Sequence, residues 1–172
     1  MAVAIVATAG SATANSYITL AEAETYMEGR SNISLWTAAT DPTKNIALVE
    51  SQRWLTNLGW LGLRADTVQA LAWPRQDVTD PDDPNRDVFD SDEVPQRIKD
   101  AQSELALEFI KAGTTDISAF DSSVEIVEER VDVIATKYDR NRPTGTARYP
   151  TVMRYIRCLL SARPFMSPLV KG

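Results

Sequence analysis

An apolar stripe from Val94 to Phe109 limits the possible folds of this chain more than any other feature. Its members are spaced by four, three, four and four residues, which places them all on one face of an α-helix. They are Val94, Ile98, Ala101, Leu105 and Phe109. Because a helix with a continuous apolar face has to bury it, the stripe predicts a core assembled around this helix.

The residues that flank the stripe predict where this helix begins and ends. Pro95 suits the first turn, where its missing N–H costs no hydrogen bond. The segment Ser91–Glu93 offers cap oxygens and negative charge to the positive end of the helix. Lys111 and Gly113 are typical of the last turn and of the residue that stops a helix.

The segment Gln69–Arg75, with the sequence QALAWPR, leads toward this helix. A helix does not continue through Trp73 into Pro74, because proline disfavours the helical conformation of the residue before it. We therefore expect the Trp73 indole at a chain reversal, wedged into the core. Trp73 and Pro74 are predicted to be a structural anchor, and nothing in them resembles catalytic chemistry.

Further helices are predicted on both sides of this anchor. Thr19 and Glu22 form a capping-box pattern that opens a helix ending near Gly29. A second helix is expected to begin at Asp41-Pro42 and to run to about Leu58, before two glycines break it. Shorter elements are expected as a strand at residues 2–6 and a helical turn at residues 67–71.

The C-terminal third is harder to interpret. Residues 124–138 fit a helical stripe and also an alternating strand pattern, but six β-branched residues between Val124 and Ile134 favour strands, as a hairpin turning near Glu128-Glu129. Residues 141–147 read as a loop, and Tyr149-Pro150 opens a last helix that places Arg154 and Arg157 together on one side. Its predicted buried residues are Val152, Met153, Ile156, Leu159 and Leu160.

Taken together, the patterns predict a mainly α fold: a compact bundle of about four to five helices, a small β-hairpin and an extended C-terminal tail. One helical domain is expected at residues 1–163, with an acidic loop at residues 77–93 and an extension at residues 164–172. The length of 172 residues is enough for one domain with a substantial core.

Composition excludes several classes of function. The chain has no histidine, which removes histidine-based acid–base catalysis, the triads that depend on it and the commonest zinc sites. A single cysteine, Cys158, rules out an internal disulfide framework. No apolar run is long enough to cross a bilayer, and the N-terminus lacks the basic region of a signal peptide, so we expect a cytosolic protein. Since the residues give no catalytic set, we also expect that the protein is not an enzyme and holds no cofactor.

Charge is divided unevenly along the chain. Residues 1–136 contain 10 Lys or Arg and 23 Asp or Glu, whereas residues 137–172 contain 8 Lys or Arg and one Asp. The basic segment therefore either meets an acidic partner, which would be a protein surface or nucleic acid, or matches an acidic part of the same fold or of a neighbouring subunit. The acidic loop carries eight acidic residues, but it has no glycine where a calcium-binding EF-hand loop needs one. We expect a solvated, mobile loop without a metal.

Several segments stand out in order along nearly the whole chain: Thr13–Ile18 with the Ala-Glu-Ala helix at residues 21–23, Gln69–Arg75, Asp90–Asp92, Val94-Pro95 and Arg148–Pro150. In these segments the chain resembles a family of phage and prophage head–tail adaptor (connector) proteins. Members of this family are often described as DnaT-like single-stranded-DNA-binding proteins. The chain fits the family loosely around Trp36 and departs from it in its proline-containing tail.

The resemblance implies a mainly helical subunit of a homo-oligomeric ring, with twelve copies, beneath the portal vertex of a phage capsid. Such a ring docks on the portal protein, extends the channel for the packaged double-stranded DNA and presents a platform to tail or nozzle proteins. It implies a location in the virion neck, assembly in the host cytoplasm and no membrane partner. An acidic channel would let DNA slide, because a basic lining would bind the phosphates.

Two sets of candidate functional residues follow. For an interface with the portal or a neighbouring subunit, arginine and apolar side chains at the C-terminus are typical interface residues. The interface candidates are Arg154, Arg157, Arg163, Phe165, Met166 and Leu169. The alternative is a single-stranded-DNA-binding protein in which arginines bind phosphates and tyrosines stack on bases. Those candidates are Arg140, Arg142, Arg148, Arg154, Arg157, Tyr149 and Tyr155.

Overall fold

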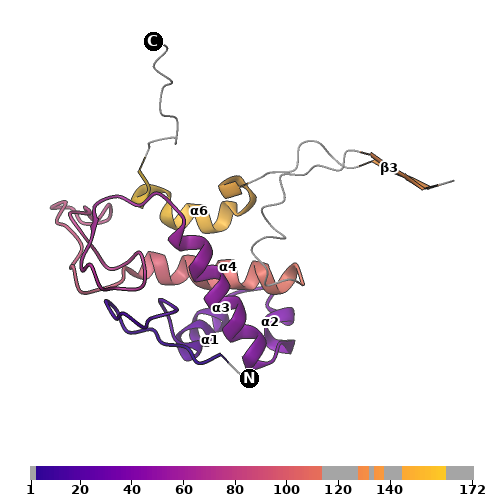
Figure 1. Cartoon of the computed structure of the whole chain (residues 1–172), viewed down its shortest axis with the longest axis horizontal. Coiled ribbons are helices and arrows are strands. Elements are labelled where there is room, and N and C mark those ends of the chain that lie inside the picture. The colour runs from indigo at the N-terminus through magenta and orange to yellow at the C-terminus, as the bar shows by residue number, and fades with distance from the viewer. Residues whose placement is uncertain (1–2, 114–127, 132–133, 138–144, 162–172) are drawn as a thin grey trace, which may run out of the picture.

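A computed structural model describes residues 3–113, 128–131, 134–137 and 145–161 of the chain. The described part is mainly α-helical, as predicted, with five α-helices (Figure 1). Within it, no helix has the length and apolar character that crossing a bilayer requires. The helices are α1 (Leu20–Glu28), α2 (Ser34–Ala38), α3 (Asp41–Thr56), α4 (Gln96–Lys111) and α6 (Pro150–Ile156), with 3-10 turns η1 (Gly145–Arg148) and η2 (Arg157–Leu159).

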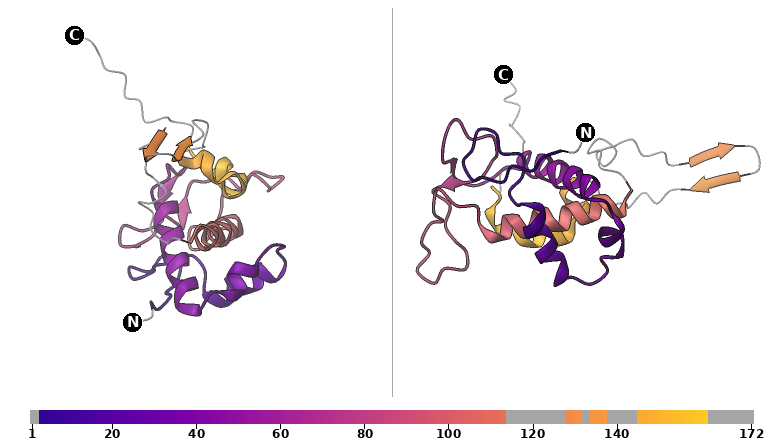
Figure 2. Two further views of the ribbon diagram at one scale, coloured as in Figure 1. Left: turned by 90° about the vertical axis from the view of Figure 1, so that its right-hand side faces the viewer. Right: turned by 90° about the horizontal axis from the view of Figure 1, so that it is seen from below.

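The helix with the apolar stripe, α4, runs through the middle of the molecule. Viewed nearly end-on, it is surrounded by α3, α6 and the pair α1 and α2 (Figure 2). All five stripe residues are buried, as expected from their spacing. Every residue from Ala101 to Leu107 is buried as well, so the middle of α4 is enclosed on all sides and not only along its stripe.

Two apolar clusters lie on either side of α4. The first joins α3, α4 and α6 with the loop around Trp73, and the second joins α1, α2, α3 and α4. The largest fully buried side chains of the first cluster are Trp73, Tyr17, Phe109, Leu55, Ile98, Leu105 and Ile156. Those of the second are Trp36, Ile18, Met27, Leu48 and Leu107.

Local sequence signals predicted some helix ends correctly and others not. The Thr19–Glu22 capping box is present at the start of α1, and Gly29 ends that helix. Before α3, Thr40 rather than Asp41 occupies the cap position. At α4 the prediction was wrong in detail, because Pro95 is itself the cap residue and no described side chain, including those of residues 91–93, caps the backbone of the first turn.

Two short antiparallel pairs complete the described elements. Strand β1 (Leu63–Arg64) pairs with β2 (Arg75–Gln76), with Leu63 opposite Gln76. Gly62 enters this pair at φ +68, where a Cβ atom would lie 2.2 Å from the Gln76 carbonyl oxygen, so only glycine fits. The predicted hairpin is present as β3 (Glu128–Val131) and β4 (Ile134–Lys137), apart from the helices (Figure 1).

Several other expectations need correction. The hairpin reverses between Val131 and Ile134, which are paired, and not at Glu128-Glu129. Residues 3–6 form no strand and residues 67–71 no helix, because hydrogen bonds from side chains shape both segments. Residues 145–147 begin a 3-10 turn where a loop was expected, and the last α-helix ends at Ile156. Helix α2 was not predicted.

Candidate functional site

We call the segments that match the family in sequence, such as Thr13–Ile18, the family-like segments. The polar side chains of Thr13–Ile18 hold the chain before α1 in place. Asn15 accepts a hydrogen bond from the Val6 N–H at its Oδ1 atom and donates one from Nδ2 to the Ala4 carbonyl, each 2.8 Å long. The Ser16 hydroxyl donates to the Ile18 carbonyl at 2.6 Å. These bonds satisfy backbone groups of a segment that forms no regular structure.

A buried glutamine of α4 ties this segment to the core. Gln102 is fully buried and accepts a hydrogen bond from the Tyr17 N–H at 2.9 Å. Its amide nitrogen donates to the Ser16 hydroxyl and to the Leu48 carbonyl of α3, both at 2.8 Å. One side chain thus joins three parts of the fold, which is a structural role.

The polar residues of the Gln69–Arg75 turn also bond to backbone. Gln69 Nε2 donates to the Leu71 carbonyl at 2.8 Å and to the Pro74 carbonyl at 3.0 Å. The Arg75 guanidinium donates to the carbonyls of Leu61 and Gly62, each at 2.6 Å. Burial, with a contribution from nearby Arg64, lowers the pKa of Arg75.

Trp73 is fully buried at the centre of this turn, and the peptide bond between Trp73 and Pro74 is cis. Its ring meets Trp60 edge-on at 5.8 Å between ring centroids and Phe89 at 6.1 Å. Pro74 is also buried. The turn is therefore a packed structural unit around Trp73 and Pro74.

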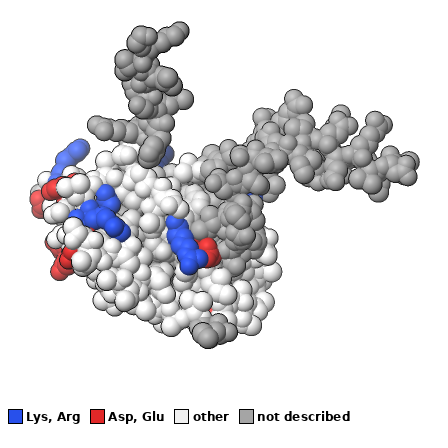
Figure 3. Space-filling model, in the orientation of Figure 1, with Lys and Arg blue, Asp and Glu red and all other residues white. Residues whose placement is uncertain are grey.

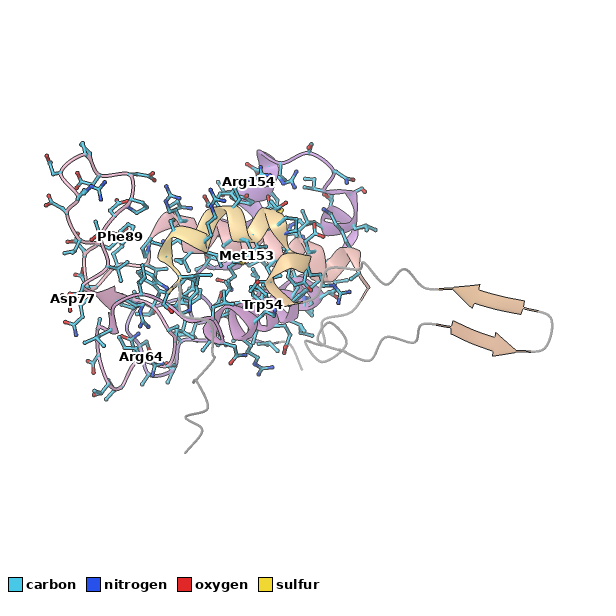
Figure 4. All side chains as sticks on the ribbon, turned by 90° about the horizontal axis from the view of Figure 1, so that it is seen from above. Trp54, Arg64, Asp77, Phe89, Met153 and Arg154 are labelled. Carbon is cyan, nitrogen blue, oxygen red and sulfur yellow. The ribbon has the colours of Figure 1, made fainter. Side chains whose placement is uncertain are left out.

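The two described arginines of the interface prediction lie on an exposed surface at the end of the chain. Arg154 and Arg157 are both exposed, and within the described residues neither has an ion-pair partner. Figure 4 shows Arg154 on the side of α6 opposite Trp54. Arg163, Phe165, Met166 and Leu169, as well as Arg140 and Arg142, lie outside the described residues.

Tyr149 does not offer the stacking surface that the nucleic-acid prediction required. It is 5% exposed and packs edge-on against Trp54 at 5.4 Å and Phe109 at 6.2 Å between ring centroids. Burial raises the pKa of its hydroxyl. The prediction was wrong here because the burial of Tyr149 depends on side chains from α3 and α4, which the local sequence does not reveal.

Tyr155 belongs to a polar cluster that joins α1, α4 and α6. Its hydroxyl lies 3.1 Å from that of Tyr26, which donates a hydrogen bond of 2.8 Å to the carboxylate of Glu104. Glu104 is 1% exposed and receives two hydrogen bonds from Arg30, at 2.6 and 3.2 Å. Burial and the neighbouring groups raise the pKa of Tyr26. Sequence reasoning missed this cluster, whose one signal is an acidic residue within an apolar helix.

The acidic loop is more ordered than its composition suggested. Thr79 and Val88 form an antiparallel bridge. The Phe89 N–H donates a hydrogen bond of 2.9 Å to the carbonyl oxygen of the buried Val78. Asp82 at the tip pairs with Arg97 of α4 and so raises the pKa of that arginine. Among the described residues, no group of three or more Asp, Glu or Cys side chains is arranged to hold a metal ion.

Two surface cavities lie beside α3 and α4. One, of about 370 Å³, lies between α1 and α4 and includes Ala21. The other, of about 560 Å³, we name the α3 groove. The α3 groove is lined by Ala14 and Asn15 before α1, by Val49, Gln52, Arg53 and Thr56 of α3, by Asn57 just after that helix, and by Ala70 and Leu71.

Comparison with curated proteins and with solved structures gives no significant match. One protein-family model matches the chain over residues 1–172, and its description is "Putative DnaT-like ssDNA binding protein". This match spans the family-like segments whose side chains bond within the fold, as well as α6 and the acidic loop. The chain belongs to this DnaT-like family.

Proposed function

We propose that the chain is a structural head–tail adaptor subunit of a tailed phage. Copies of it would form a ring, of twelve subunits, beneath the portal protein, extend the channel for packaged double-stranded DNA and carry the tail or nozzle proteins. The ring would reside in the virion neck after assembly in the host cytoplasm. The proposal assigns the chain no enzymatic activity, no cofactor and no membrane partner.

The observation that carries this proposal is the contrast between the arginines and the tyrosines around α6. Arg154 and Arg157 are exposed and have no ion-pair partner among the described residues, so they are available to another protein. Arginine is enriched at protein interfaces, where its planar group binds carboxylates and stacks on aromatic rings. Tyr149 is instead packed between Trp54 and Phe109.

Single-stranded-DNA binding is the second candidate, and the description of the family favours it. Arg154 and Arg157 could contact phosphates in such a complex. Stacking on successive bases, however, uses exposed aromatic faces. Tyr149 is buried and the Tyr155 hydroxyl is bound to that of Tyr26, so these two residues support stacking poorly.

Two measurements on the full-length protein separate the candidates. Native mass spectrometry and negative-stain imaging, with and without the cognate portal, should show a closed ring of this chain on the portal. Fluorescence anisotropy with oligo(dT) at about 150 mM salt, where exposed charges are screened beyond roughly 8 Å, should show no tight binding. Tight binding to oligo(dT) together with the absence of portal association would favour the second candidate.

A further inference from the structure

The α3 groove is a surface with one charged side chain in its lining, and no described segment covers it. Its buried residues include Ala14, Val49 and Leu71, which are 6%, 8% and 6% exposed. Arg53 is the one charged residue in its lining, and it is already paired with Glu50 one turn earlier. In the orientation of Figure 1, α3 lies toward the viewer, and Figure 3 shows mostly uncharged side chains on that face. The chemistry of the groove suits an apolar, acid-free peptide.

The last described residues run toward one end of this groove. The Leu61 N–H donates to the Leu159 carbonyl at 2.9 Å, and the Ser161 N–H donates to the Gly59 carbonyl at 2.7 Å. Between them, Trp60 and Leu160 form an antiparallel bridge. Because the two segments run in opposite directions, the backbone at Ser161 heads toward the Leu58 side of this pair, next to Asn57, which lines one end of the groove.

The remaining chain is long enough and has a suitable composition. The 11 residues at 162–172 can extend over roughly 36–40 Å, whereas the eight residues of α3 from Val49 to Thr56 rise about 12 Å. The segment contains no acidic residue and has three large apolar side chains, those of Phe165, Met166 and Leu169. Its prolines reduce the conformational entropy that docking would remove.

We propose that residues 164–169 dock in the α3 groove of their own subunit, with Phe165, Met166 and Leu169 covering its apolar walls. A tether this short gives an effective concentration in the millimolar range, so an intrinsic Kd of about 0.1 mM would keep the tail docked about nine-tenths of the time. Such a weak contact holds the apolar side chains away from solvent and still releases them to a tighter-binding partner. The docking does not depend on the adaptor function and would hold equally in a DNA-binding protein.

Hydrogen exchange of the full-length protein tests the docking. At nine-tenths occupancy, amides of residues 165–170 that are protected only when docked should exchange about tenfold more slowly than in a free peptide of the same sequence. Ala70→Arg places a long charged side chain at the groove and should abolish this protection. Ala21→Arg, at the cavity between α1 and α4, is the matched control and should leave it unchanged. The proposal would be overturned if the tail amides exchange at the free-peptide rate, or if their protection is the same in the Ala70→Arg variant as in the unmodified protein.

Cysteine trapping determines whose tail occupies the groove. In a Cys158→Ser background, Asn57→Cys with Met166→Cys should form a disulfide within one chain under mild oxidation, visible as a shifted monomer band. Ala21→Cys with Met166→Cys provides the control and should form far less of it. Disulfide-linked dimers in place of the shifted monomer would assign the groove to a neighbouring copy, and yields equal to the control would exclude docking. Either result contradicts docking within one subunit.

Discussion

At the scale of single residues, the polar side chains of the family-like segments act mainly on the backbone of their own fold. Asn15, Gln69, Arg75 and Gln102 all bond to main-chain groups in segments without helical or strand ladders. Since a buried N–H or C=O group without a partner is costly, these side chains are what allow the irregular loops to pack tightly. The segments that identify the family therefore report on its fold more directly than on its function.

Trp73 gives the first prediction at this scale. Trp73→Ala should lower the free energy of unfolding by about 3–5 kcal/mol, because it empties a fully buried site between Trp60 and Phe89. Trp73→Phe should cost clearly less, because it keeps a ring and the indole N–H has no hydrogen-bond partner among the described residues. Chemical denaturation of both variants measures the difference. Equal and small losses would show that the ring is not an anchor.

Gln102 gives the second prediction at the scale of single residues. Gln102→Met keeps the size of the side chain but leaves the Tyr17 N–H without its acceptor, whereas the Leu48 carbonyl still accepts from the Ser51 hydroxyl at 2.8 Å. The expected loss of unfolding free energy is about 1–3 kcal/mol, typical of one buried donor left unsatisfied. Gln96→Met, at an exposed glutamine of the same helix, is the control and should change stability little. A loss of equal size in both variants would contradict this role.

At the scale of elements, sequence predicted best where the signal is local. The capping box of α1 and the stripe of α4 depend on residues a few positions apart, and both are present. Helix α2 was missed because its five residues are too few for a periodic pattern, and it is held from outside: the Trp36 indole donates to the Glu24 carboxylate of α1 at 3.1 Å. Tyr149 was misjudged for the same reason, since its environment comes from other helices.

The α1 capping box gives the prediction for this scale. Thr19→Ala removes the oxygen that accepts from the Glu22 N–H at 3.2 Å, and it should cost about 1 kcal/mol of unfolding free energy. Thr25→Ala, in the middle of the same exposed helix face, should cost little or nothing. Thermal melts of the two variants measure the contrast. Equal losses in both variants would mean that the cap itself adds nothing.

The α1 capping box also predicts how the stability of the fold depends on pH. The hydrogen bond from the Thr19 N–H to the Glu22 carboxylate, at 2.7 Å, and nearby Lys99 lower the pKa of Glu22 in the folded state. Its contribution to stability is therefore complete above the unfolded pKa of about 4.3 and is lost as the pH falls through the lower folded pKa. Glu22→Gln should make stability fall less steeply below about pH 4.3. An unchanged slope in acid titrations would exclude a contribution from Glu22.

At the scale of the whole molecule, the described part is a helical body with two exposed arginines, Arg154 and Arg157, near its C-terminal end. The central helix is enclosed by four others, and the acidic loop is fastened to it through Asp82 and Arg97. Arg97 also lies 3.8 Å from Cys158, beside the last turn of the chain. Acidic and basic surfaces thus adjoin at one end of the body, which suits a subunit that recognises charged partners.

Charge reversal at α6 is the prediction that distinguishes this surface from the rest of the molecule. Arg154→Glu and Arg157→Glu should leave the melting temperature nearly unchanged, because both side chains are exposed and form no ion pair within the described residues. Each should weaken association with the portal or with neighbouring copies at least tenfold, measured by co-sedimentation and native mass spectrometry. Arg86→Glu is the matched control: Arg86 is also exposed, also has no ion-pair partner in the described part, and its reversal changes the net charge by the same amount. If all three variants lose assembly equally, overall charge and not the α6 surface is responsible; if the α6 variants assemble normally, these arginines are not part of the interface.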